Sequence, residues 1–304
     1  SSDVCSSDLK DIGTPSDSVV VLGYFDGIHK GHQELFRVAN KAARKDLLPI
    51  VVMTFNESPK IALEPYHPDL FLHILNPAER ERKLKREGVE ELYLLDFSSK
   101  FASLTAEEFF ATYIKAMNAK IIVAGFDYTF GSDKKTAEDL KNYFDGEVII
   151  VPPVEDEKGK ISSTRIRQAI LDGNVKEAGE LLGAPLPSRG MVVHGNARGR
   201  TIGYPTANLV LLDRTYMPAD GVYVVDVEIQ RQKYRAMASV GKNVTFDGEE
   251  ARFEVNIFDF NQDIYGETVM VYWLDRIRDM TKFDSVDQLV DQLKADEEVA
   301  RNWS

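Results

Sequence analysis

Cysteine, positive charge and long hydrophobic runs are all scarce in this chain. The 304 residues include one cysteine, which leaves no partner for an internal disulfide and favours a reducing compartment such as the cytoplasm. Lys and Arg total 37 against 49 Asp and Glu, a formal charge of −12 that disfavours a nucleic-acid-binding surface. No apolar stretch approaches the length of a membrane span, and no secretory signal is visible. We therefore expect neither nucleic acid nor a membrane as a partner; the oligomeric state stays open.

The first nine residues, SSDVCSSDL, differ in character from the rest of the chain. They repeat Ser-Ser-Asp, do not begin with methionine and have no apolar periodicity. We predict that residues 1–9 are a non-native tail outside the fold, in which case Cys5 is foreign too.

The remaining sequence is of the α/β class and shows two different patterns of predicted strands and helices. Apolar strand-like runs alternate with helix-like segments up to about residue 183, which predicts βαβ units and a parallel, Rossmann-like sheet. From residue 191, short alternating strands separated by Gly, Asn and Asp predict a small antiparallel β-barrel, and 285–302 is a predicted C-terminal helix. The segment APLPSRG at 184–190 is typical of a linker. We accordingly expect two domains, 10–184 and 185–304.

The stretch VVVLGYFDGIHKGHQELF at 19–36 leads from a buried strand through a glycine turn into a helix. His29 and His32 thus fall at a helix N-terminus, where unsatisfied backbone N–H groups and the positive end of the helix dipole suit a phosphate. Ligands of parallel sheets bind at this end of the strands. Two histidines three apart face the same way, which favours a phosphate site over ordinary polar turn residues.

A second candidate for phosphate binding is ISSTRIR at 161–167. Ser163 or Thr164 stands where a helix would be capped, with Arg165 and Arg167 just inside. Hydroxyls, backbone N–H groups and guanidinium groups together can hold a polyphosphate. Arg167 is the better candidate of the two arginines because it lies one helical step from the hydroxyls. The alternative is a plain N-cap beside solvated arginines.

Two further stretches give weaker signals. AGFDYTFG at 124–131 follows a strand, where Asp127 could accept a hydrogen bond from a hydroxyl or a base; a turn with core aromatics is the alternative. GNARGRTIGYPTANL at 195–209 joins a flexible basic loop to Thr206 and Asn208, neutral oxygen donors that suit Mg²⁺ held jointly with nucleotide phosphates. A simple turn is again the alternative, and the Walker pattern is absent.

Taken in order, these stretches resemble a known family. GYFDGIHKGH (23–32) is similar to the H-x-G-H signature of nucleotidyltransferases, SSTRIR (162–167) to their second phosphate motif, and GRTIGYPTANL (199–209) to the riboflavin kinase motif. FEVNIFDF with DIYG (253–266) and KFDS (282–285) resemble the remaining kinase signatures. Beyond residue 10, essentially the whole chain resembles the bacterial bifunctional riboflavin kinase/FMN adenylyltransferases, also called FAD synthetases.

The resemblance implies two reactions and a set of residues for each. The barrel would transfer the γ-phosphate of ATP to riboflavin, giving FMN, and the N-terminal domain would transfer AMP from a second ATP to FMN, giving FAD and pyrophosphate. Riboflavin, FMN and ATP are then the partners, and Mg²⁺ is the cofactor. The resemblance implies catalytic roles for Glu254, His29 and His32, and metal binding by Thr206 and Asn208. For ATP and its phosphates in adenylyl transfer it implies Gly23, Phe25, Asp26, Gly31, Ser163, Thr164 and Arg167. For flavin or nucleotide it implies Asp127, Gly195, Arg200, Gly203 and Pro205.

Two positions depart from the family pattern, and two other classes stay open. Ser58 stands before Pro59 where the family usually has a histidine, which puts a nucleotide contact there in doubt, and Asn256 stands where histidine is common. A class I aminoacyl-tRNA synthetase also fits H-x-G-H, but the acidic charge disfavours it. A flavin-binding regulatory protein with inactive sites is disfavoured by the presence of His29, His32 and Glu254.

Overall fold

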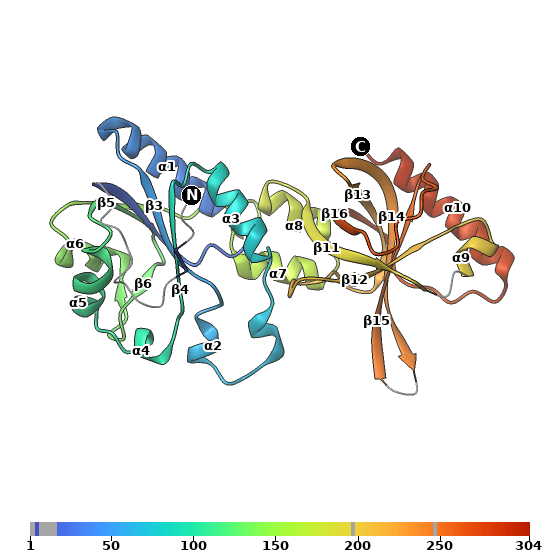
Figure 1. The fold of residues 1–304 in the computed structure, drawn as a ribbon, viewed down its shortest axis with the longest axis horizontal. Helices are drawn as coiled ribbons and strands as arrows, with labels where there is room; N and C mark the ends of the chain where they lie inside the picture. Colours follow the sequence, from blue (N-terminus) through green and yellow to red (C-terminus); the bar gives the residue numbers. More distant parts are fainter. Residues whose placement is uncertain (1–3, 6–16, 196–197, 246–247) are drawn as a thin grey trace. The chain divides into compact units, whose positions relative to one another are not determined.

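The computed structural model describes residues 4–5, 17–195, 198–245 and 248–304 and divides the chain into two compact units (Figure 1). The first unit extends to Leu72 and from Asn76 to Ser162, and the second contains His73–Leu75 and Ser163–Ser304. The first unit is built on a parallel sheet with helices, and the second on a closed antiparallel barrel with helices. The predicted fold class is thereby confirmed.

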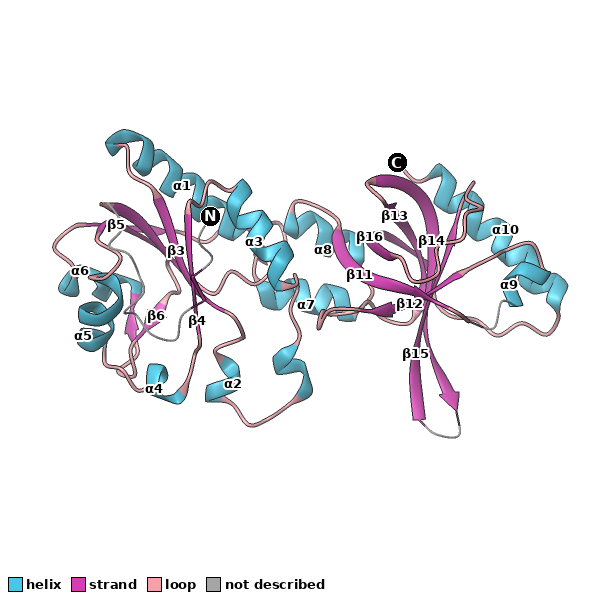
Figure 2. Ribbon diagram, viewed as in Figure 1, coloured by secondary structure: helices cyan, strands magenta, loops and turns pink. Residues whose placement is uncertain are grey.

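Five strands form the centre of the first unit (Figure 2): β2 (Ser18–Leu22), β3 (Ile50–Phe55), β4 (Glu91–Leu95), β5 (Ala119–Gly125) and β8 (Glu147–Val151). They lie parallel in the order β4-β3-β2-β5-β8. The chain adds β3 and β4 on one side of β2 and then returns to add β5 on the other side. The crevice beyond the carboxyl ends of the strands at such a switch is where ligands of open α/β sheets bind.

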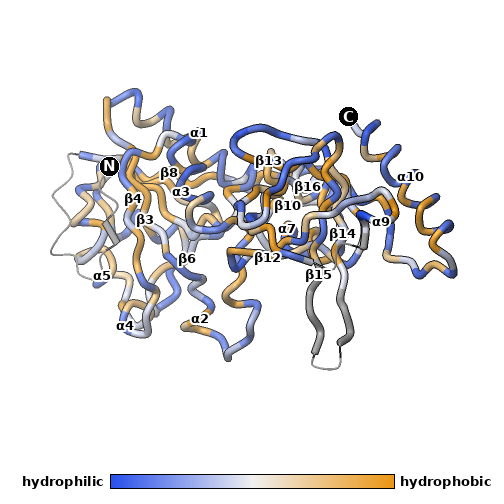
Figure 3. The backbone as a smooth tube through the Cα atoms, turned by 45° about the vertical axis from the view of Figure 1, so that its right-hand side comes forward, coloured by the Kyte–Doolittle hydropathy of each residue, from blue (hydrophilic) through white to orange (hydrophobic). Residues whose placement is uncertain are grey.

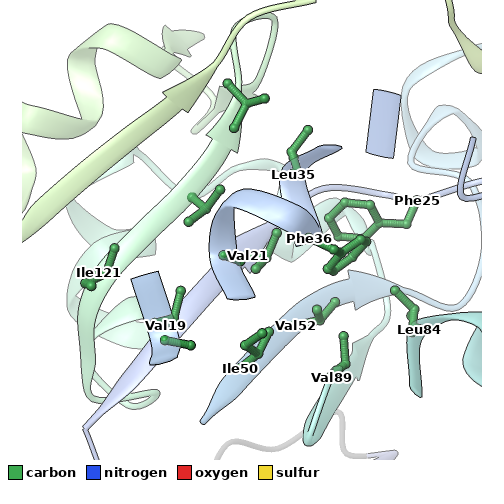
Figure 4. Close-up of a cluster of buried hydrophobic side chains, with 14 of the residues drawn as sticks. Val19, Val21, Phe25, Leu35, Phe36, Ile50, Val52, Leu84, Val89 and Ile121 are labelled. Carbon is green, nitrogen blue, oxygen red and sulfur yellow. The ribbon is translucent and has the colours of Figure 1, made fainter. Parts of the chain in front are cut away.

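Helices cover both faces of this sheet, so the alternating side chains of its central strand are buried on both sides. Val19 and Val21 of β2 belong to one buried cluster, shown in Figure 4, and Val20 and Leu22 belong to another on the opposite face. The first face is covered by α1 (Lys30–Asp46) and α3 (Pro77–Arg86). The second is covered by α5 (Ala106–Phe109), a π-helical turn (Phe110–Ile114) and α6 (Leu140–Tyr143). In Figure 3 the strands β3 and β4 are largely hydrophobic, whereas α1 alternates between hydrophobic and hydrophilic residues.

Short elements complete the first unit. They are α2 (Lys60–Leu63), a 3₁₀ turn (Pro68–Phe71), α4 (Ser99–Ala102), β6 (Thr129–Phe130), β7 (Lys135–Thr136), a 3₁₀ turn (Ala137–Asp139), β9 (Glu155–Asp156) and β10 (Gly159–Lys160). A capping box starts α5: the Thr105 hydroxyl accepts a hydrogen bond from the Glu108 N–H, and the Glu108 carboxylate accepts one from the Thr105 N–H.

The second unit closes a barrel in the order β11-β12-β15-β14-β13-β16. Its strands are β11 (Leu186–Val193), β12 (Ala207–Leu211), β13 (Gly221–Ile229), β14 (Gln232–Thr245), β15 (Gly248–Ile257) and β16 (Thr268–Arg278). Trp273 of β16 is fully buried, and its ring contacts those of Tyr223 and Phe253, each with 5.3 Å between the centroids. The helices of the unit are α7 (Ser163–Leu171), α8 (Val175–Leu182), α9 (Arg198–Thr201) and α10 (Val286–Asn302).

Three expectations from the sequence can be compared with the structure: the linker, the N-terminal tail and the domain boundary. The predicted linker 184–190 is wrong, because β11 already begins at Leu186 and the hydroxyl of Ser188 accepts a hydrogen bond from Trp273 Nε1 at 2.8 Å. Of residues 1–9, which we expected outside the fold, Val4–Cys5 form a two-residue strand, β1, parallel to β4; the rest of that segment lies outside the described residues. The domain boundary predicted near 184 stays a prediction, while α7 and α8 group with the barrel in the second unit.

Candidate functional site

The turn that joins β2 to α1 has an unusual backbone. Phe25, Gly27 and Ile28 all have positive φ, at 58°, 89° and 46°. Phe25 and Ile28 are fully buried, so packing holds two L-residues in a conformation that they rarely adopt. The Phe25 ring lies over Gly23, where a Cβ atom would approach it to 2.7 Å. Strained and tightly packed segments of this kind concentrate at functional sites.

This turn brings His29 and His32 together. His29 is the N-cap of α1, and its Nδ1 accepts a hydrogen bond from the backbone N–H of His32 at 3.3 Å. The two imidazole rings stack with 3.7 Å between their centroids, and the Phe25 ring meets that of His32 edge-on at 5.3 Å. A Cβ atom on Gly31 would lie 3.0 Å from the His29 ring and 3.5 Å from the Ile161 carbonyl oxygen, so glycine leaves the room that the ring needs.

Two lysines and one aspartate surround the histidine pair. Burial, followed by the charges of Lys160 and Lys83, lowers the pKa of His29 to about 4, although Asp127 acts in the opposite direction. Burial also lowers the pKa of His32 well below its usual value, together with His29 and the same two lysines. Both imidazoles are therefore neutral at pH 7. A neutral His29 whose Nδ1 accepts a hydrogen bond has its proton on Nε2, which makes Nε2 a donor.

Asp127 lies at the carboxyl end of β5, next to the strand switch. Its carboxylate pairs with Lys160 Nζ at 2.5 Å, and the same ammonium lies 4.5 Å from the centre of the Phe126 ring. Tyr128 and Phe130 instead join the buried aromatic cluster of the sheet, as the structural alternative for this stretch proposes. Asp127 is thus close enough to the histidines to affect His29, while its two aromatic neighbours are structural.

The remaining residues predicted for adenylyl transfer divide between the two units. Gly23, Phe25, Asp26 and Gly31 belong to the histidine turn, and Asp26 is buried. Ser163, Thr164 and Arg167 lie in the first two turns of α7, in the second unit. Arg165 of the same helix pairs with Glu177 of α8 at 2.8 Å, and the choice of Arg167 as the arginine for phosphate stays a prediction.

In the second unit, Asn208 and Glu254 are direct partners across β12 and β15. Directly opposed residues of antiparallel strands share one face, and Ser239 of β14 continues the row on the other side of Glu254. Gly195 approaches the same place, because a Cβ atom there would lie 2.1 Å from Asn208 Nδ2. The structure thus brings together three of the predicted residues, Gly195, Asn208 and Glu254.

The loop before β12 is held by the strand beside it. Asn256 is buried, and its Nδ2 donates a hydrogen bond to the Pro205 carbonyl oxygen at 2.6 Å. The residue that departs from the family pattern therefore fixes the backbone next to Thr206. Ser58, the other departure, accepts a 3.4 Å hydrogen bond from the Lys60 N–H and supports the start of α2. Both departures have local structural roles.

A pocket of about 510 Å³ opens in the second unit beside this loop. Its lining includes Arg200, Pro205 and Thr206, with the segment 260–265 opposite. Val255 of β15 and Ala207 of β12, the neighbours of Glu254 and Asn208, also line it. Gly203 belongs to the same loop and has φ of +84°, which favours glycine.

Comparison with known protein families agrees with both halves of this description. Residues 11–165 match the model of the FAD synthetase family, and residues 182–304 match that of riboflavin kinase. This chain belongs to the bifunctional riboflavin kinase/FMN adenylyltransferase family. It catalyses the phosphorylation of riboflavin to FMN and the adenylylation of FMN to FAD, with ATP as co-substrate.

Curated members of the family match over nearly their full lengths. The enzyme of Listeria monocytogenes is 38% identical over 95% of this chain and 93% of its own length. That of Bacillus subtilis is 37% identical over 93% of this chain and 91% of its own. Both are named bifunctional riboflavin kinase/FMN adenylyltransferase, so the similarity extends over both activities.

A crystal structure from Streptococcus pneumoniae is 97% identical to this chain, covers 98% of each chain and superimposes with a TM-score of 0.96. It is named a macrolide-efflux protein. None of the helices that the structure describes in the present chain has the length and apolar character that a membrane crossing requires. The family models and the curated relatives agree with each other on flavin nucleotide synthesis and do not share that name.

Three residues of the first site were missed by the sequence analysis: Arg80, Lys83 and Lys160. Lys160 comes directly before the ISSTRIR motif, and this position was the available signal. Arg80 and Lys83 lie on a helix so rich in charge that no single residue stands out. Their orientation depends on how α3 packs, which local sequence does not specify.

Proposed function

We propose that the histidine turn of the first unit is the adenylyl-transfer site of this enzyme. The observation that supports it best is the stacked pair of neutral imidazoles at the N-terminus of α1, with Lys83, Lys160 and Asp127 close by. The FMN phosphate attacks the α-phosphorus of ATP as an anion, and the bond to the bridging oxygen of the leaving pyrophosphate breaks. Such a reaction needs no protein nucleophile, only stabilisation of the charge that develops on the phosphate oxygens.

The roles of the individual residues follow from this assignment. His29 Nε2–H and the backbone N–H groups at the start of α1 donate hydrogen bonds to phosphate oxygens, with His32 beside them. Gly23, Phe25, Asp26 and Gly31 shape the turn. Ser163, Thr164 and Arg167 remain the residues proposed to bind ATP through hydroxyl and guanidinium groups, and 10–184 remains the proposed adenylyltransferase part. Asp127 accepts a hydrogen bond from a substrate hydroxyl or base.

The kinase reaction is assigned to the row formed by Asn208 and Glu254, within the part that spans 185–304. Phosphorylation of a hydroxyl requires a proton acceptor, and the Glu254 carboxylate removes the proton from the riboflavin 5′-hydroxyl as that oxygen attacks the γ-phosphorus. The bond from the γ-phosphorus to its bridging oxygen breaks, and ADP leaves with the electron pair. Gly195, Arg200, Gly203 and Pro205 form the nucleotide and flavin surroundings. ATP is the co-substrate of both reactions, and we place them in the cytoplasm.

Thr206 and Asn208 fit a Mg²⁺ ion bound together with ATP. Mg²⁺ usually takes few protein ligands and keeps waters and substrate phosphates, so two neutral side-chain oxygens suffice. No group of three or more His, Cys, Asp and Glu side chains is placed for a metal in the part of the chain that the structure describes. When bound, the ion would neutralise charge on the phosphates; Thr206 and Asn208 would orient it.

The test separates the two reactions. Purified enzyme is given riboflavin with ATP, or FMN with ATP, and FMN and FAD are separated by chromatography. The double change His29→Ala and His32→Ala should lower FAD formation by at least about 10²-fold, the usual effect of losing a preorganised donor, and leave FMN formation intact. An equal fall in both activities would contradict the assignment of one reaction to each part.

A further inference from the structure

The helix α3 presents a buried arginine to the ends of the central strands. Arg80 is 2% exposed, although it belongs to a helix dominated by charged residues. Its Nη2 donates hydrogen bonds to the carbonyl oxygens of Phe55 at 2.8 Å and Asn56 at 3.3 Å, and its guanidinium group lies 5.4 Å from the centre of the Tyr24 ring. Phe55 is the last residue of β3 and Asn56 follows it, and Tyr24 lies two residues after the end of β2. Arg80 therefore fixes α3 against the edge of the sheet where ligands bind.

Lys83 lies three residues after Arg80 and so on the same side of the helix. Its Nζ donates a hydrogen bond to the Gly27 carbonyl oxygen at 3.5 Å, two residues before His29. Burial lowers the pKa of Lys83 to about 8, against the opposing effect of Glu87, and Arg86 lowers it further. Lys83 also lowers the pKa of both histidines, so its charge acts on the phosphate turn. By contrast, Lys85 on the same helix is exposed and pairs with Glu81.

We propose that Lys83 binds the β- and γ-phosphates of ATP during adenylyl transfer, as a cation supplied by α3 opposite the histidines. A half-buried ammonium group is costly to desolvate, and the arrival of a polyphosphate would compensate that cost. When the bond to the α-phosphorus breaks, its electron pair goes to the departing pyrophosphate, and Lys83 stabilises the new charge. This proposal rests on the assignment of adenylyl transfer to the histidine turn.

The test uses Lys83→Met, Lys83→Arg and, as a matched control, Lys85→Met in the full-length enzyme. With FMN as substrate, Lys83→Met should lower kcat/KM for ATP by about 10- to 100-fold, the usual effect of losing a charge-assisted hydrogen bond, and should weaken product inhibition by pyrophosphate. Lys83→Arg should restore most of the activity and Lys85→Met should retain it. Hydrogen-exchange protection of the α1 amides, which Lys83→Met should keep, reports on folding of the first unit. Riboflavin phosphorylation by the same preparations reports on the second unit and should not change.

A pH profile separates phosphate binding from a merely structural contact with Gly27. In the wild type, kcat/KM for ATP should decline as pH rises through about 8, where Lys83 loses its proton. Lys83→Arg should remove this decline because arginine stays charged. The charged groups that act on Lys83 are Glu87 and Arg86 on α3. The titratable groups on which its own charge acts are His29 and His32, which are neutral at this pH and are also affected by Lys160 of β10.

Three results would overturn the proposal: unchanged kcat/KM for ATP in Lys83→Met, the same loss in Lys85→Met, or the same pH profile in Lys83→Arg as in the wild type. If the double histidine variant still makes FAD normally, the location of the adenylyl-transfer site is wrong as well. If only the Lys83 variants behave like the wild type, that location stands and the lysine proposal alone fails.

Discussion

At the scale of the residue, burial decides the chemistry of the histidine pair. A solvated histidine is partly protonated near neutral pH, whereas burial, followed by the charges of Lys160 and Lys83, lowers the pKa of His29 to about 4. The neutral form keeps one N–H donor and one acceptor per ring, and His29 uses its acceptor to cap α1. The turn therefore relies on Lys83 and Lys160 for positive charge and on the histidines for directed hydrogen bonds.

Burial of His29 has a consequence for stability in acid. Between pH 6.5 and 4 the unfolded chain binds a proton at this residue that the folded chain does not, so the free energy of unfolding falls as pH decreases through this range. The full contribution is about 3 kcal/mol, at about 1.4 kcal/mol per pKa unit. His29→Asn keeps an N-cap acceptor and removes the titration, so the first unit should lose less stability between pH 7 and pH 5 than the wild type.

Hydrogen exchange of the α1 amides measures this effect directly. Tryptophan fluorescence would not serve, because Trp273 and Trp303 both belong to the second unit. Those two tryptophans instead provide the control, since the pH dependence of the second unit should be the same in both proteins. Identical pH dependence of α1 protection in His29→Asn and wild type would show that His29 is not the titrating group.

The Glu254 carboxylate is predicted to act as the base of the kinase. Glu254→Gln keeps the shape and removes the proton acceptor, so FMN formation should fall by roughly 10²- to 10⁴-fold. FMN that is supplied directly should still become FAD at a near-normal rate. The matched control is Glu228→Gln on β13 of the same barrel, whose carboxylate accepts a hydrogen bond from the Tyr272 hydroxyl at 3.2 Å and should matter little to catalysis. Full kinase activity of Glu254→Gln would exclude this role.

At the scale of the element, the sequence predicts correctly those features that depend on residues close together in the chain. The alternation of strands and helices and the turn from β2 into α1 both depend on neighbouring residues. The orientation of Lys83 depends on the packing of α3 against distant strand ends, which periodicity does not report. The prediction of a linker at 184–190 was wrong for a related reason. Its prolines and glycine indicate a loop, but pairing of β11 with β12 and β16 makes residues 186–190 part of a strand.

The approach of the loop before α9 to β12 yields a prediction about one glycine. A Cβ atom on Gly195 would lie 2.1 Å from Asn208 Nδ2 and 2.3 Å from Asn208 Cγ, so Gly195→Ala must displace the Asn208 side chain or the loop. Because Asn208 lies beside Glu254 and is proposed to orient Mg²⁺, the KM for ATP in the kinase reaction should rise about tenfold or more, equivalent to about 1.4 kcal/mol. The steady-state rate of FMN formation at varied ATP checks this.

A control glycine is available in the same unit. Gly179 of α8 has room for a methyl group, since the nearest atoms to its Cβ position are 3.5 Å away, and alanine favours helices. Gly179→Ala should therefore keep both activities and retain or slightly raise the melting temperature. If Gly195→Ala has the kinetics of Gly179→Ala, the close approach of Gly195 to Asn208 is not needed for the kinase reaction.

At the scale of the whole molecule, one chain holds two reactions in series, and the product of the barrel is the substrate of the sheet unit. The residues proposed for each reaction lie in largely separate sets, and the hydrophobic clusters that support them do not share members. A substitution that abolishes one of the two reactions should therefore leave the other reaction intact. This independence can be tested with two variants that are each unable to make FAD from riboflavin.

Neither Glu254→Gln nor the double variant His29→Ala and His32→Ala should convert riboflavin to FAD alone, because each lacks one step. An equimolar mixture should do so, after a lag in which FMN accumulates in solution, since one protein makes FMN and the other adenylylates it. Chromatography of timed samples follows all three flavins, and combining all the substitutions in one chain gives the control that stays inactive. If the mixture made FMN but no FAD, while Glu254→Gln still adenylylated supplied FMN, the product of the kinase would have to remain on the chain that made it.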